Sequence, residues 1–395
     1  METWDVLIVG AGASGLMCAI GAANRGRRVL LLDHAPRLGN KIRASGGGRC
    51  NFTNLDASPE HYVSANPHFC RSALDRFGPE DFVALLRKNT ILFHDKKPGQ
   101  LFCDGPAQQI VDMLLADARE AGAEWREGVT VTGASHQGEL FRVETSTEPV
   151  EGKKLVVACG GLSHPRLGAT GLGYDLARSF GHEIVPTRPA LDGFLFAAES
   201  KELFGDLAGL AQDAEVTCAG RTFADPVLFT HVGLSGPAVL QASLFWELGA
   251  EVTVNFAPAV PGGILDYLVK TKARGSLQTP ATLLGRVLPK RLAECFASAF
   301  LPGQVNLAQT RRDELEVLAQ AIGAYRFIPK DTAGWDKAEV TRGGVDTGEI
   351  SSKTMESLKV PGLYFTGEVL DVTGELGGYN LQWAWSSGWA AGEAV

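Results

Sequence analysis

The sequence predicts an α/β protein whose main domain is formed by both ends of the chain and interrupted by an insert of about residues 190–335. Three observations predict this fold. A strand–helix–strand unit occupies the first thirty or so residues. The pattern changes near Pro186–Pro189, where short strands and then helical patterns begin. A glycine-rich pattern returns near residue 337 and ends in a strand, a glycine loop and a helix.

The first half of the main domain contains buried strands separated by helices. Val6–Val9 and Val29–Leu32 are short apolar β-branched or leucine runs, typical of parallel strands that are covered on both faces. Residues 14–25 between them have helical spacing. Further helices are predicted near 67–77, 79–88 and 106–121, short antiparallel strands within 124–147, and another buried strand at Lys154–Ala158.

The insert has a different pattern from the rest of the chain. Short strands are predicted at Glu215–Cys218, Pro226–Phe229 and Glu251–Val254, and helices from about 262 to 320. The main domain then resumes with the strand Leu363–Phe365 and a final helix at about 380–392.

Length and composition bound the class of protein. A chain of 395 residues exceeds the ~250–300 residues of a single core, so two or three domains are expected. With 45% hydrophobic residues the chain is not intrinsically disordered. Its 47 glycines exceed the usual ~7% and cluster in loops, which indicates close approach of backbone to a ligand.

Charge and targeting signals point to a cytoplasmic protein with a small-molecule partner. The formal net charge of -8 argues against a nucleic-acid partner. No apolar run approaches the ~18 residues of a membrane span, and the first residues lack the basic region of a signal peptide, so no membrane association is expected. The seven scattered cysteines have no zinc-binding spacing, so no metal site is predicted.

The first glycine loop carries the strongest functional signal. Gly10-Ala11-Gly12-Ala13-Ser14-Gly15 reads GxGxxG at the junction of a strand and a helix. Such glycines allow a tight turn, approach to a pyrophosphate and close helix packing, and the helix N-terminus faces the phosphates. Asp33, at the end of the next strand, is placed to accept hydrogen bonds from ribose hydroxyls.

The fingerprint alone does not separate FAD from NAD. Its position at the N-terminus, together with a C-terminal strand–glycine–helix segment, favours FAD. Gly377-Gly378-Tyr379-Asn380 precedes the last helix, whose positive end would stabilise charge on a reduced flavin. A second glycine loop spans Ser45–Asn54, and Lys41 and Arg49 beside it could neutralise phosphate.

Taken together, these motifs resemble one family over essentially the whole chain, the bacterial aminoacetone-oxidase-like flavoproteins of the YhiN/BaiN group. The motifs occur in a fixed order: Ser45–Asn54, Phe229–Pro237, Val340–Val345, Gly367–Gly374 and Gly377–Asn380. The resemblance implies a split FAD-binding Rossmann-like domain with a β-barrel-like insert and a small helical insert. The corresponding boundaries are 1–188 and 336–395 for the FAD-binding domain, 189–260 for the β-rich insert and 261–335 for the helical insert.

The resemblance also implies non-covalent FAD and a set of cofactor contacts. Together with the fingerprint, these are Gly10, Ala11, Gly12, Ser14, Gly15, Asp33, His34, Lys41, Ser45, Gly46, Gly47, Gly48, Arg49, Cys50, Asn51, Val129, Gly160, Gly161, Gly367, Asp371, Gly378, Asn380 and Leu381.

Three classes of function stay open at this point. The first is a flavin oxidase of a small amine of the aminoacetone type, re-oxidised by oxygen, and it is the leading expectation. The second is an NAD(P)H-dependent flavin reductase of a conjugated carbonyl compound, and the third a non-catalytic flavin-binding redox sensor. Because a flavin carries the chemistry itself, no hydrolytic triad is expected.

Two residues are candidates for a catalytic role. His231 lies in the most motif-like stretch of the insert and could accept a proton. Cys50 follows Arg49, whose charge could lower the pKa of the thiol and make it redox-active. His164 is a weaker candidate of the same kind as His231.

No second dinucleotide fingerprint is found. Gly168–Gly173 has its glycines in the wrong order and more plausibly starts a helix against the FAD-binding domain. We therefore expect no tight, independent NAD(P)H site, although NAD(P)H remains possible as a transient electron donor.

Overall fold

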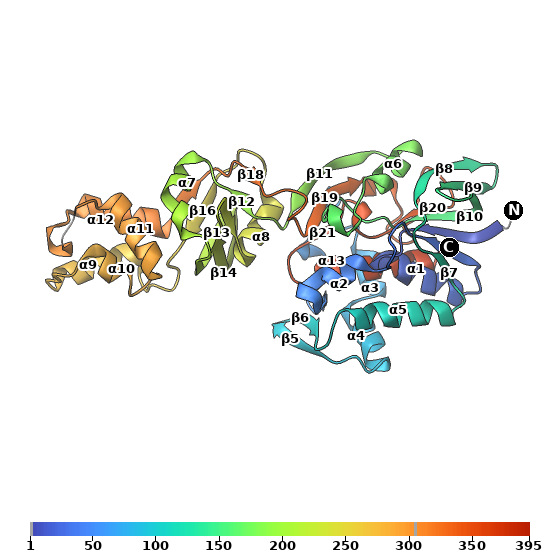
Figure 1. Ribbon diagram of the computed structural model, residues 1–395, viewed down its shortest axis with the longest axis horizontal. Coiled ribbons are helices and arrows are strands. Elements are labelled where there is room, and N and C mark those ends of the chain that lie inside the picture. Colours follow the sequence, from blue (N-terminus) through green and yellow to red (C-terminus); the bar gives the residue numbers. More distant parts are fainter. Residues whose placement is uncertain (1–2, 304–305) are drawn as a thin grey trace. The chain divides into compact units, whose positions relative to one another are not determined.

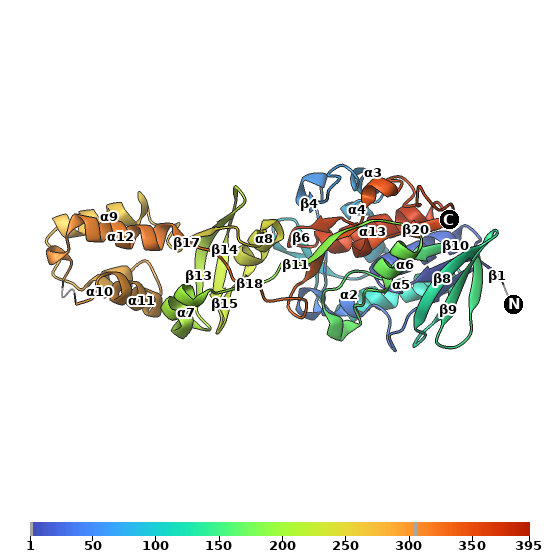
Figure 2. The same cartoon turned by 90° about the horizontal axis from the view of Figure 1, so that it is seen from above.

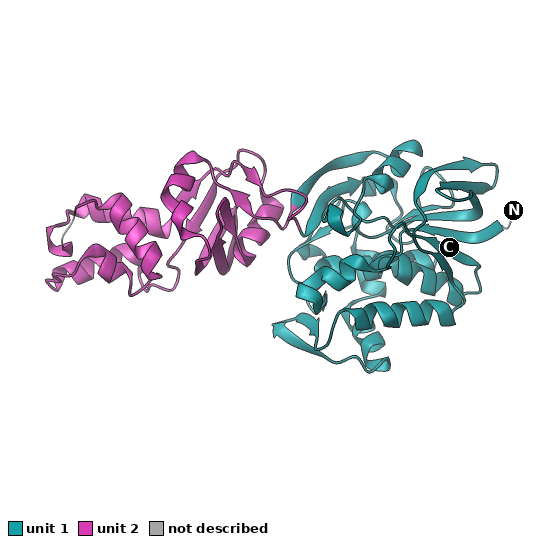
Figure 3. Cartoon of the chain, viewed as in Figure 1, with its two compact units in different colours: residues 1–189, 339–395 teal, residues 190–338 magenta. Residues whose placement is uncertain are grey.

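The computed structural model describes residues 3–303 and 306–395. It divides into two compact units, which Figure 3 colours separately: unit 1 comprises residues 1–189 and 339–395, and unit 2 comprises residues 190–338. The α/β prediction is confirmed. Unit 1 has a mixed seven-stranded sheet with helices, and unit 2 has a second seven-stranded sheet followed by helices.

The sheet of unit 1 is parallel at its centre. Its strands run in the order β7 (Glu124–Arg126), β2 (Val29–Leu32), β1 (Thr3–Val9), β10 (Val150–Val157), β9 (Leu140–Thr145) and β8 (Val131–Gln137). The second half of β10 also pairs in parallel with β20 (Leu363–Phe365), so the C-terminal segment completes the N-terminal sheet. Strand β7 was expected among the antiparallel strands of 124–147, but it pairs in parallel with β2.

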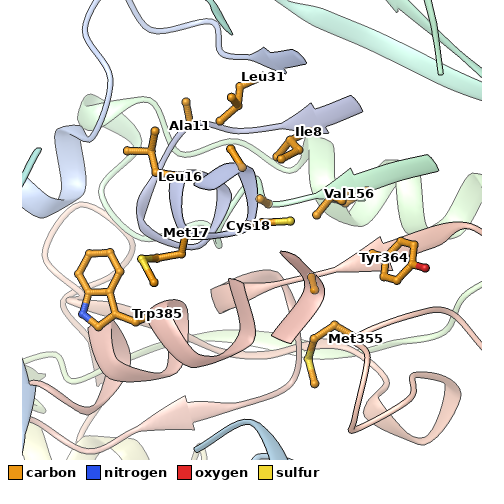
Figure 4. Close-up of a cluster of buried hydrophobic side chains, with 14 of the residues drawn as sticks. Ile8, Ala11, Leu16, Met17, Cys18, Leu31, Val156, Met355, Tyr364 and Trp385 are labelled. Carbon is orange, nitrogen blue, oxygen red and sulfur yellow. The ribbon is translucent and has the colours of Figure 1, made fainter. Parts of the chain in front are cut away.

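Helices from the two ends of the chain pack together in one core. Helix α1 (Ala13–Asn24) packs against α13 (Tyr379–Gly392), and a Cβ added to Gly388 would lie 2.3 Å from the carbonyl oxygen of Ser14. Figure 4 shows Met17 of α1 beside Trp385 of α13, with Ile8 and Leu31 of the sheet above them. Trp383 and Trp385 are therefore core residues.

The remaining elements of unit 1 surround this core (Figures 1 and 2). They are α2 (Asn40–Ala44), η1 (Ser45–Gly48), β3 (Asn51–Asn54), η2 (Pro59–His61), β4 (Tyr62–Val63), α3 (Arg71–Arg76), α4 (Pro79–Lys88), β5 (Phe93–Lys97), β6 (Gln100–Cys103), α5 (Gln108–Glu120), η3 (Pro165–Leu167), α6 (Leu172–Ser179), β11 (Ile184–Ala190), β19 (Val340–Val345), η6 (Thr347–Glu349), η7 (Gly367–Val369) and β21 (Thr373–Gly374). Residues 168–173 lead into α6, the helix start that the sequence predicts there.

Unit 2 combines a sheet with a helical segment. The sheet order is β17 (Tyr325–Phe327), β16 (Val252–Asn255), β13 (Ala211–Cys218), β14 (Arg221–Phe229), β15 (Gly233–Ser235), β12 (Phe194–Leu195) and β18 (Asp331–Thr332). Helices α7 (Ala198–Phe204), η4 (Gly205–Leu207) and α8 (Pro237–Phe245) lie within this part.

The helical part contains α9 (Gly263–Ala273), α10 (Pro280–Leu284), α11 (Lys290–Phe300), η5 (Leu307–Gln309) and α12 (Arg312–Gly323). After α12 the chain returns to the sheet as β17 and β18. Residues 325–332 thus join the β-rich part, although the sequence analysis assigned them to the helical insert.

Among the described residues, no helix combines the length and the apolarity that crossing a bilayer requires.

Candidate functional site

The candidate site lies in unit 1, where the loops after β1, β2, β10 and β20 leave the carboxyl edge of the parallel sheet. Ligands of open α/β sheets bind at this edge. The loops contain most of the glycines expected to contact a cofactor, and these glycines fall into two groups according to the space around them.

The first group is packed tightly against backbone. A Cβ at Gly15 would lie 1.9 Å from the carbonyl oxygen of Gly10, and a Cβ at Gly10 would lie 2.4 Å from that of Ala158. A Cβ at Gly46 or Gly378 would also be too close to backbone, whereas a Cβ at Gly161 or Gly367 would collide with side chains. These glycines shape the loops because no side chain fits there.

The second group faces open space. A Cβ added to Gly12, Gly47, Gly48 or Gly160 would meet no atom within 4 Å. Packing therefore does not require glycine at these positions, and at Gly12 φ is −84°, which any residue adopts. Bare backbone facing free space is what a pyrophosphate needs in order to reach N–H groups.

Two helices start at the edge of this space with unshielded N-termini. Neither α1, preceded by Gly12, nor α13, preceded by Gly378, has an acidic residue in its first turn or a side-chain cap. The free N–H groups and the positive end of each helix dipole suit an anion. The residues present therefore fit an anionic dinucleotide cofactor such as FAD.

Asp33 does more than the sequence predicts. Its two carboxylate oxygens accept the backbone N–H of Ala11 at 2.7 Å and of Ala35 at 2.8 Å, so it ties the first glycine loop to the end of β2. A carboxylate has about four acceptor sites, which leaves capacity for ribose hydroxyls. Val129 donates its N–H to the carbonyl oxygen of Asp33 at 2.9 Å, and the imidazole of His34 lies 3.8 Å from the carboxylate.

Lys41 was expected to neutralise phosphate, but its ammonium is bound within the protein. It lies 2.5 Å from Glu368 Oε2 and 2.7 Å from Ser163 Oγ. Glu368 Oε1 in turn accepts the N–H of Thr341 at 2.8 Å and the hydroxyl of Ser163 at 3.1 Å. The oxygens Thr341 Oγ1 and Glu368 Oε1 would collide with any Cβ at Gly161.

Glu368 is a site residue that the sequence analysis missed. Burial acts to raise the pKa of its carboxyl, but the charge of Lys41 and the hydrogen bonds from Lys41, Thr341 and Ser163 outweigh it and hold the pKa below its ordinary value. The signal was present, because Glu368 directly follows Gly367 at the end of β20. Its partners Lys41, Ser163 and Thr341 come from three separate segments, which no local pattern reveals.

The second glycine loop is held by its own backbone. Gly46, Gly47 and Gly48 all have positive φ, and the hydroxyl of Ser45 donates to the carbonyl oxygen of Ile42 at 2.8 Å. The guanidinium of Arg49 donates to the carbonyl oxygen of Asp104 at 3.3 Å.

The structure does not support a reactive thiolate at Cys50. The residue is fully buried, and burial raises the pKa of its thiol to about 12 despite a hydrogen bond with Ser45. The guanidinium of neighbouring Arg49 is directed to a backbone carbonyl instead. A buried thiol of this kind is inert, so Cys50 is a packing residue of the loop.

The C-terminal contacts bind the ends of the chain together. Ser14 Oγ lies 3.4 Å from the carbonyl oxygen of Thr366, and Gly367 receives hydrogen bonds from the indole of Trp383 and gives one to Ser387. Ser14 thus joins α1 to the end of β20.

Polar side chains around the start of α13 are also engaged. Asn380 bonds to both backbone groups of Gly374, and Asp371 accepts the N–H of Ala65 at 2.7 Å. Asn51, with its amide oriented to satisfy both partners, bridges Leu101 and the N–H of Gly378. Leu381 is half-buried in the first turn of α13. These residues shape the start of α13.

A histidine that lies between two carboxylates beside α13 was not predicted. His61 places Nδ1 3.0 Å from Glu375 Oε2 and Nε2 3.2 Å from Asp56 Oδ2, and its ring stacks on Tyr379 with centroids 4.7 Å apart. The two carboxylates and the ring of Tyr379 fix the orientation of this imidazole next to the first turn of α13.

The other two histidine candidates are His231 in unit 2 and His164 in unit 1. His231 belongs to unit 2, exposed in the turn between β14 and β15 that Thr230 holds through its hydroxyl. His164, in unit 1, has φ of +60° and lies 3.8 Å from Glu339. Its backbone conformation marks it as a turn residue before η3.

No group of His, Cys, Asp and Glu within the described residues could hold a metal ion. A groove of about 570 Å³ occurs in unit 2, lined by Phe300, Asp313, Glu316, Val317, Gln320, Ala321, Ala324, Tyr325 and Arg326.

Comparison with known proteins gives a consistent result. The HI0933-like protein Rossmann domain matches residues 4–394. The chain is 45% identical to the ribosomal RNA dihydrouridine synthase of Escherichia coli over 394 residues, which cover 100% of this chain and 98% of that protein. It is 42% identical to the protein of the same name from Haemophilus influenzae, with 98% of each chain covered.

Two further similarities are more distant. The 3-dehydro-bile acid delta(4,6)-reductase of Clostridium scindens is 32% identical, with 98% of each chain covered. The solved structure of a 3-ketosteroid-delta4-(5alpha)-dehydrogenase from Rhodococcus jostii aligns with a TM-score of 0.51 at 14% identity, covering 100% of this chain and 96% of that one. At this identity the structural match shows the fold alone.

Proposed function

The chain belongs to the HI0933-like family of FAD-binding Rossmann proteins, and from that premise we propose that it reduces a carbon–carbon double bond conjugated to a carbonyl group, in a uridine of ribosomal RNA. That it is an FAD-dependent oxidoreductase is the part shown by the family and its relatives. The observation that carries the finer proposal is the 45% identity, over the whole chain, to a ribosomal RNA dihydrouridine synthase.

The two named activities among the relatives share one chemistry. Dihydrouridine is uridine with its C5–C6 double bond saturated, and that bond is conjugated to the C4 carbonyl. A dehydro-bile acid reductase also saturates double bonds conjugated to a ketone. The expectation that fits this pattern is the conjugated-carbonyl reductase, whereas oxidation of an aminoacetone-type amine, the leading expectation from the sequence, is not confirmed.

The chain's own groups can meet the proton requirement of such a reduction. Saturating the bond adds one hydrogen as hydride and one as a proton, and FAD, when bound in its reduced form, supplies the hydride chemistry. We assign the role of proton donor to His61, which lies between Glu375 and Asp56 and stacks on Tyr379 beside α13. The carboxylates keep the ring oriented.

This proposal revises one expectation. The acidic net charge argued against a nucleic-acid partner, but a ribosomal RNA substrate requires one. An RNA base is a planar group at the end of a flexible backbone, and enzymes that modify bases act on nucleotides that are unpaired or turned out of a helix.

The test uses the FAD-loaded protein under anaerobic conditions. NADPH or NADH is mixed with the protein and flavin absorbance is followed, and the reduced protein is then incubated with unmodified ribosomal RNA made by transcription. Digestion and mass spectrometry detect uridines that have gained two hydrogen atoms. A His61→Gln variant, with FAD content unchanged, should lower the rate about 10²–10⁴-fold if the residue supplies the proton.

Two other reactions serve as controls under the same conditions. Aminoacetone tests the amine-oxidase alternative, since it would bleach the flavin directly and transfer electrons to oxygen. A steroid with a conjugated ketone tests the small-molecule reductase alternative. Bleaching by aminoacetone with no change in RNA would refute the proposed function, and failure of every donor and substrate would favour a redox sensor.

A further inference from the structure

Positive charge is concentrated in one segment of unit 2. Between residues 270 and 312 the chain has eight lysines and arginines and one acidic residue, Glu294, although the whole chain has a net charge of -8. An asymmetry of this kind in an acidic protein marks an interaction surface for a polyanion. The basic residues are Lys270, Lys272, Arg274, Arg286, Lys290, Arg291, Arg311 and Arg312.

The fold collects six of these residues at one end of the helical part. Lys272, near the end of α9, donates to the carbonyl oxygen of Thr310 at 2.5 Å, just before Arg311 and Arg312 at the start of α12. Gln278 accepts the side chain of Arg286 at 2.7 Å. We call the following set the basic end: Lys270, Lys272, Arg274, Arg286, Arg311 and Arg312.

Backbone contacts close the same region. The carbonyl oxygen of Gln278 accepts the N–H of Leu307 at 3.1 Å, which joins the loop after α9 to the segment before α12. Figures 1 and 2 both show α9 running beside α12, and α10 beside α11. The six cations therefore come from three chain segments that meet in space, and the sequence alone does not show that they meet.

The side chains of the basic end are available to a partner. Lys270, Arg311 and Arg312 are 66%, 71% and 71% exposed. Lys270 pairs with Asp266, Arg311 with Asp313 and Glu314, and Arg312 with Glu316. Exposed ion pairs of this kind are weak, so phosphates can replace the carboxylates.

The other three residues carry the rest of the charge. Among the described residues, Lys272, Arg274 and Arg286 have no carboxylate within ion-pair distance. Lys290 and Arg291 are left out of the set because they begin α11, where Arg291 bonds to the carbonyl oxygens of Asp206 and Ala208 in the β-rich part of the unit.

We propose that the basic end of the helical part is the surface on which this protein binds the phosphate backbone of its RNA substrate. The inference rests on the proposed function, because it assigns a partner to the same enzyme. Arginine and lysine contacts to phosphate fix position and carry most of the affinity, while they carry no sequence information. The catalytic unit then needs only to recognise the base.

The test compares two triple variants of the full-length, FAD-loaded protein. One is Lys270→Gln, Arg274→Gln and Arg286→Gln in the basic end. The control is Lys201→Gln, Lys330→Gln and Lys337→Gln, three exposed lysines of the same unit that lie outside the basic end. Both remove three positive charges from unit 2, so net charge alone cannot distinguish them.

Binding of a fluorescently labelled RNA hairpin is measured by anisotropy across a range of salt concentrations. For the basic-end variant we expect affinity to fall about tenfold or more near 0.15 M salt, and the slope of log affinity against log salt to shrink by about two to three. The control variant should keep the affinity and slope of the wild-type protein. FAD content, and flavin reduction by NADPH where it occurs, should be unchanged in both.

Each other outcome overturns the inference. Equal loss in the two variants, no loss in the basic-end variant, or absence of salt-dependent RNA binding by the wild-type protein would each do so. Binding to phosphatidylserine vesicles in place of RNA would assign the surface to a membrane.

Failure of the inference is distinguishable from failure of the proposed function. Wild-type protein that binds RNA through the basic end without saturating a uridine would refute the function alone. Dihydrouridine formation with an unchanged KM in the basic-end variant would refute the surface alone.

Discussion

The two units use their residues in different ways. In unit 1, glycines with tight backbone contacts and a buried polar network around Glu368 shape the loops at the edge of the sheet. In unit 2, aromatic rings fill the interior: Phe256 has ring centroids 5.8, 5.7 and 5.7 Å from those of Phe204, Phe229 and Phe296.

The difference indicates a division of work. Where backbone itself must meet a ligand, side chains are removed and polar groups hold the loops in place. Where a segment only has to fold and present a surface, apolar packing suffices and charge can be placed outside. Unit 1 contains the candidate cofactor site, and unit 2 contains the basic end that we propose for the RNA contact.

The largest expected effect tests whether the two units fold separately. Replacing fully buried Phe256 by Ala in unit 2 should destabilise that unit by ~3–5 kcal/mol, because a large cavity opens among the rings. Calorimetry should show an earlier first transition, while flavin fluorescence shows FAD still bound. The counterpart in unit 1 is Phe82→Ala, whose ring stacks on Trp385 at 4.4 Å. Release of FAD at the first transition of the Phe256 variant would show that the units do not fold separately.

A smaller effect concerns open and closed glycines. Gly12→Ala should leave the fold intact, since its Cβ meets nothing within 4 Å, but should weaken FAD about ten- to hundredfold by blocking backbone hydrogen bonds to phosphate, each worth ~1.5–3 kcal/mol. Fluorescence titration of the apoprotein with FAD measures this. The control is Gly205→Ala in unit 2, which is equally open and has φ of −56°. Unchanged FAD affinity in Gly12→Ala would place the phosphates elsewhere.

The ion pair of Lys41 and Glu368 should have a moderate effect. Glu368→Gln should cost unit 1 ~1–2 kcal/mol, a figure reduced from the buried-pair range because Lys41 is 39% exposed. A folded pKa below the ordinary 4.5 stabilises the protein above that value, and the contribution is lost as pH falls through the folded pKa. Thermal melts from pH 7 to 3 should therefore show that acidification lowers the stability of the variant less than that of the wild-type protein. In a double-mutant cycle with Lys41→Met, additive losses would mean that the two charges are not coupled.

The smallest expected effect concerns one buried titratable group in each unit, His182 in unit 1 and Asp192 in unit 2. Burial lowers the pKa of His182 in unit 1, despite its hydrogen bond to Glu349, so its folded form favours the neutral ring. The contribution of His182 to the free energy of unfolding should be fully present above pH 6.5, the ordinary pKa of histidine. It should be lost as the pH falls from that value through the lower pKa of the folded state. In unit 2, burial raises the pKa of Asp192, so acidification acts in the opposite sense there. Melts of wild type and His182→Gln between pH 7.5 and 5.5 measure the difference, and equal acid loss in both would exclude His182 as its source.

Much of the fold follows from local pattern. The strands at Val29–Leu32 and Leu363–Phe365 have the predicted bounds, because apolar runs between turn residues leave few alternatives. The parallel pairing of β7 and the return of residues 325–332 to the sheet of unit 2 were missed. A short strand has too few residues for its pattern to identify the strand with which it pairs, because that strand lies far away in the sequence.

In the candidate site, too, local sequence predicts some features and only packing determines the others. The glycine fingerprint, Asp33 and the start of α13 are identifiable from sequence, because the geometry that a dinucleotide demands is local and admits few residue types. Burial, charge pairing and the meeting of distant segments are set by packing. Packing made Cys50 an inert thiol, bound Lys41 to Glu368, placed His61 between Glu375 and Asp56, and gathered six cations at the basic end. These properties depend on distances between residues far apart in the chain, which only the folded molecule defines.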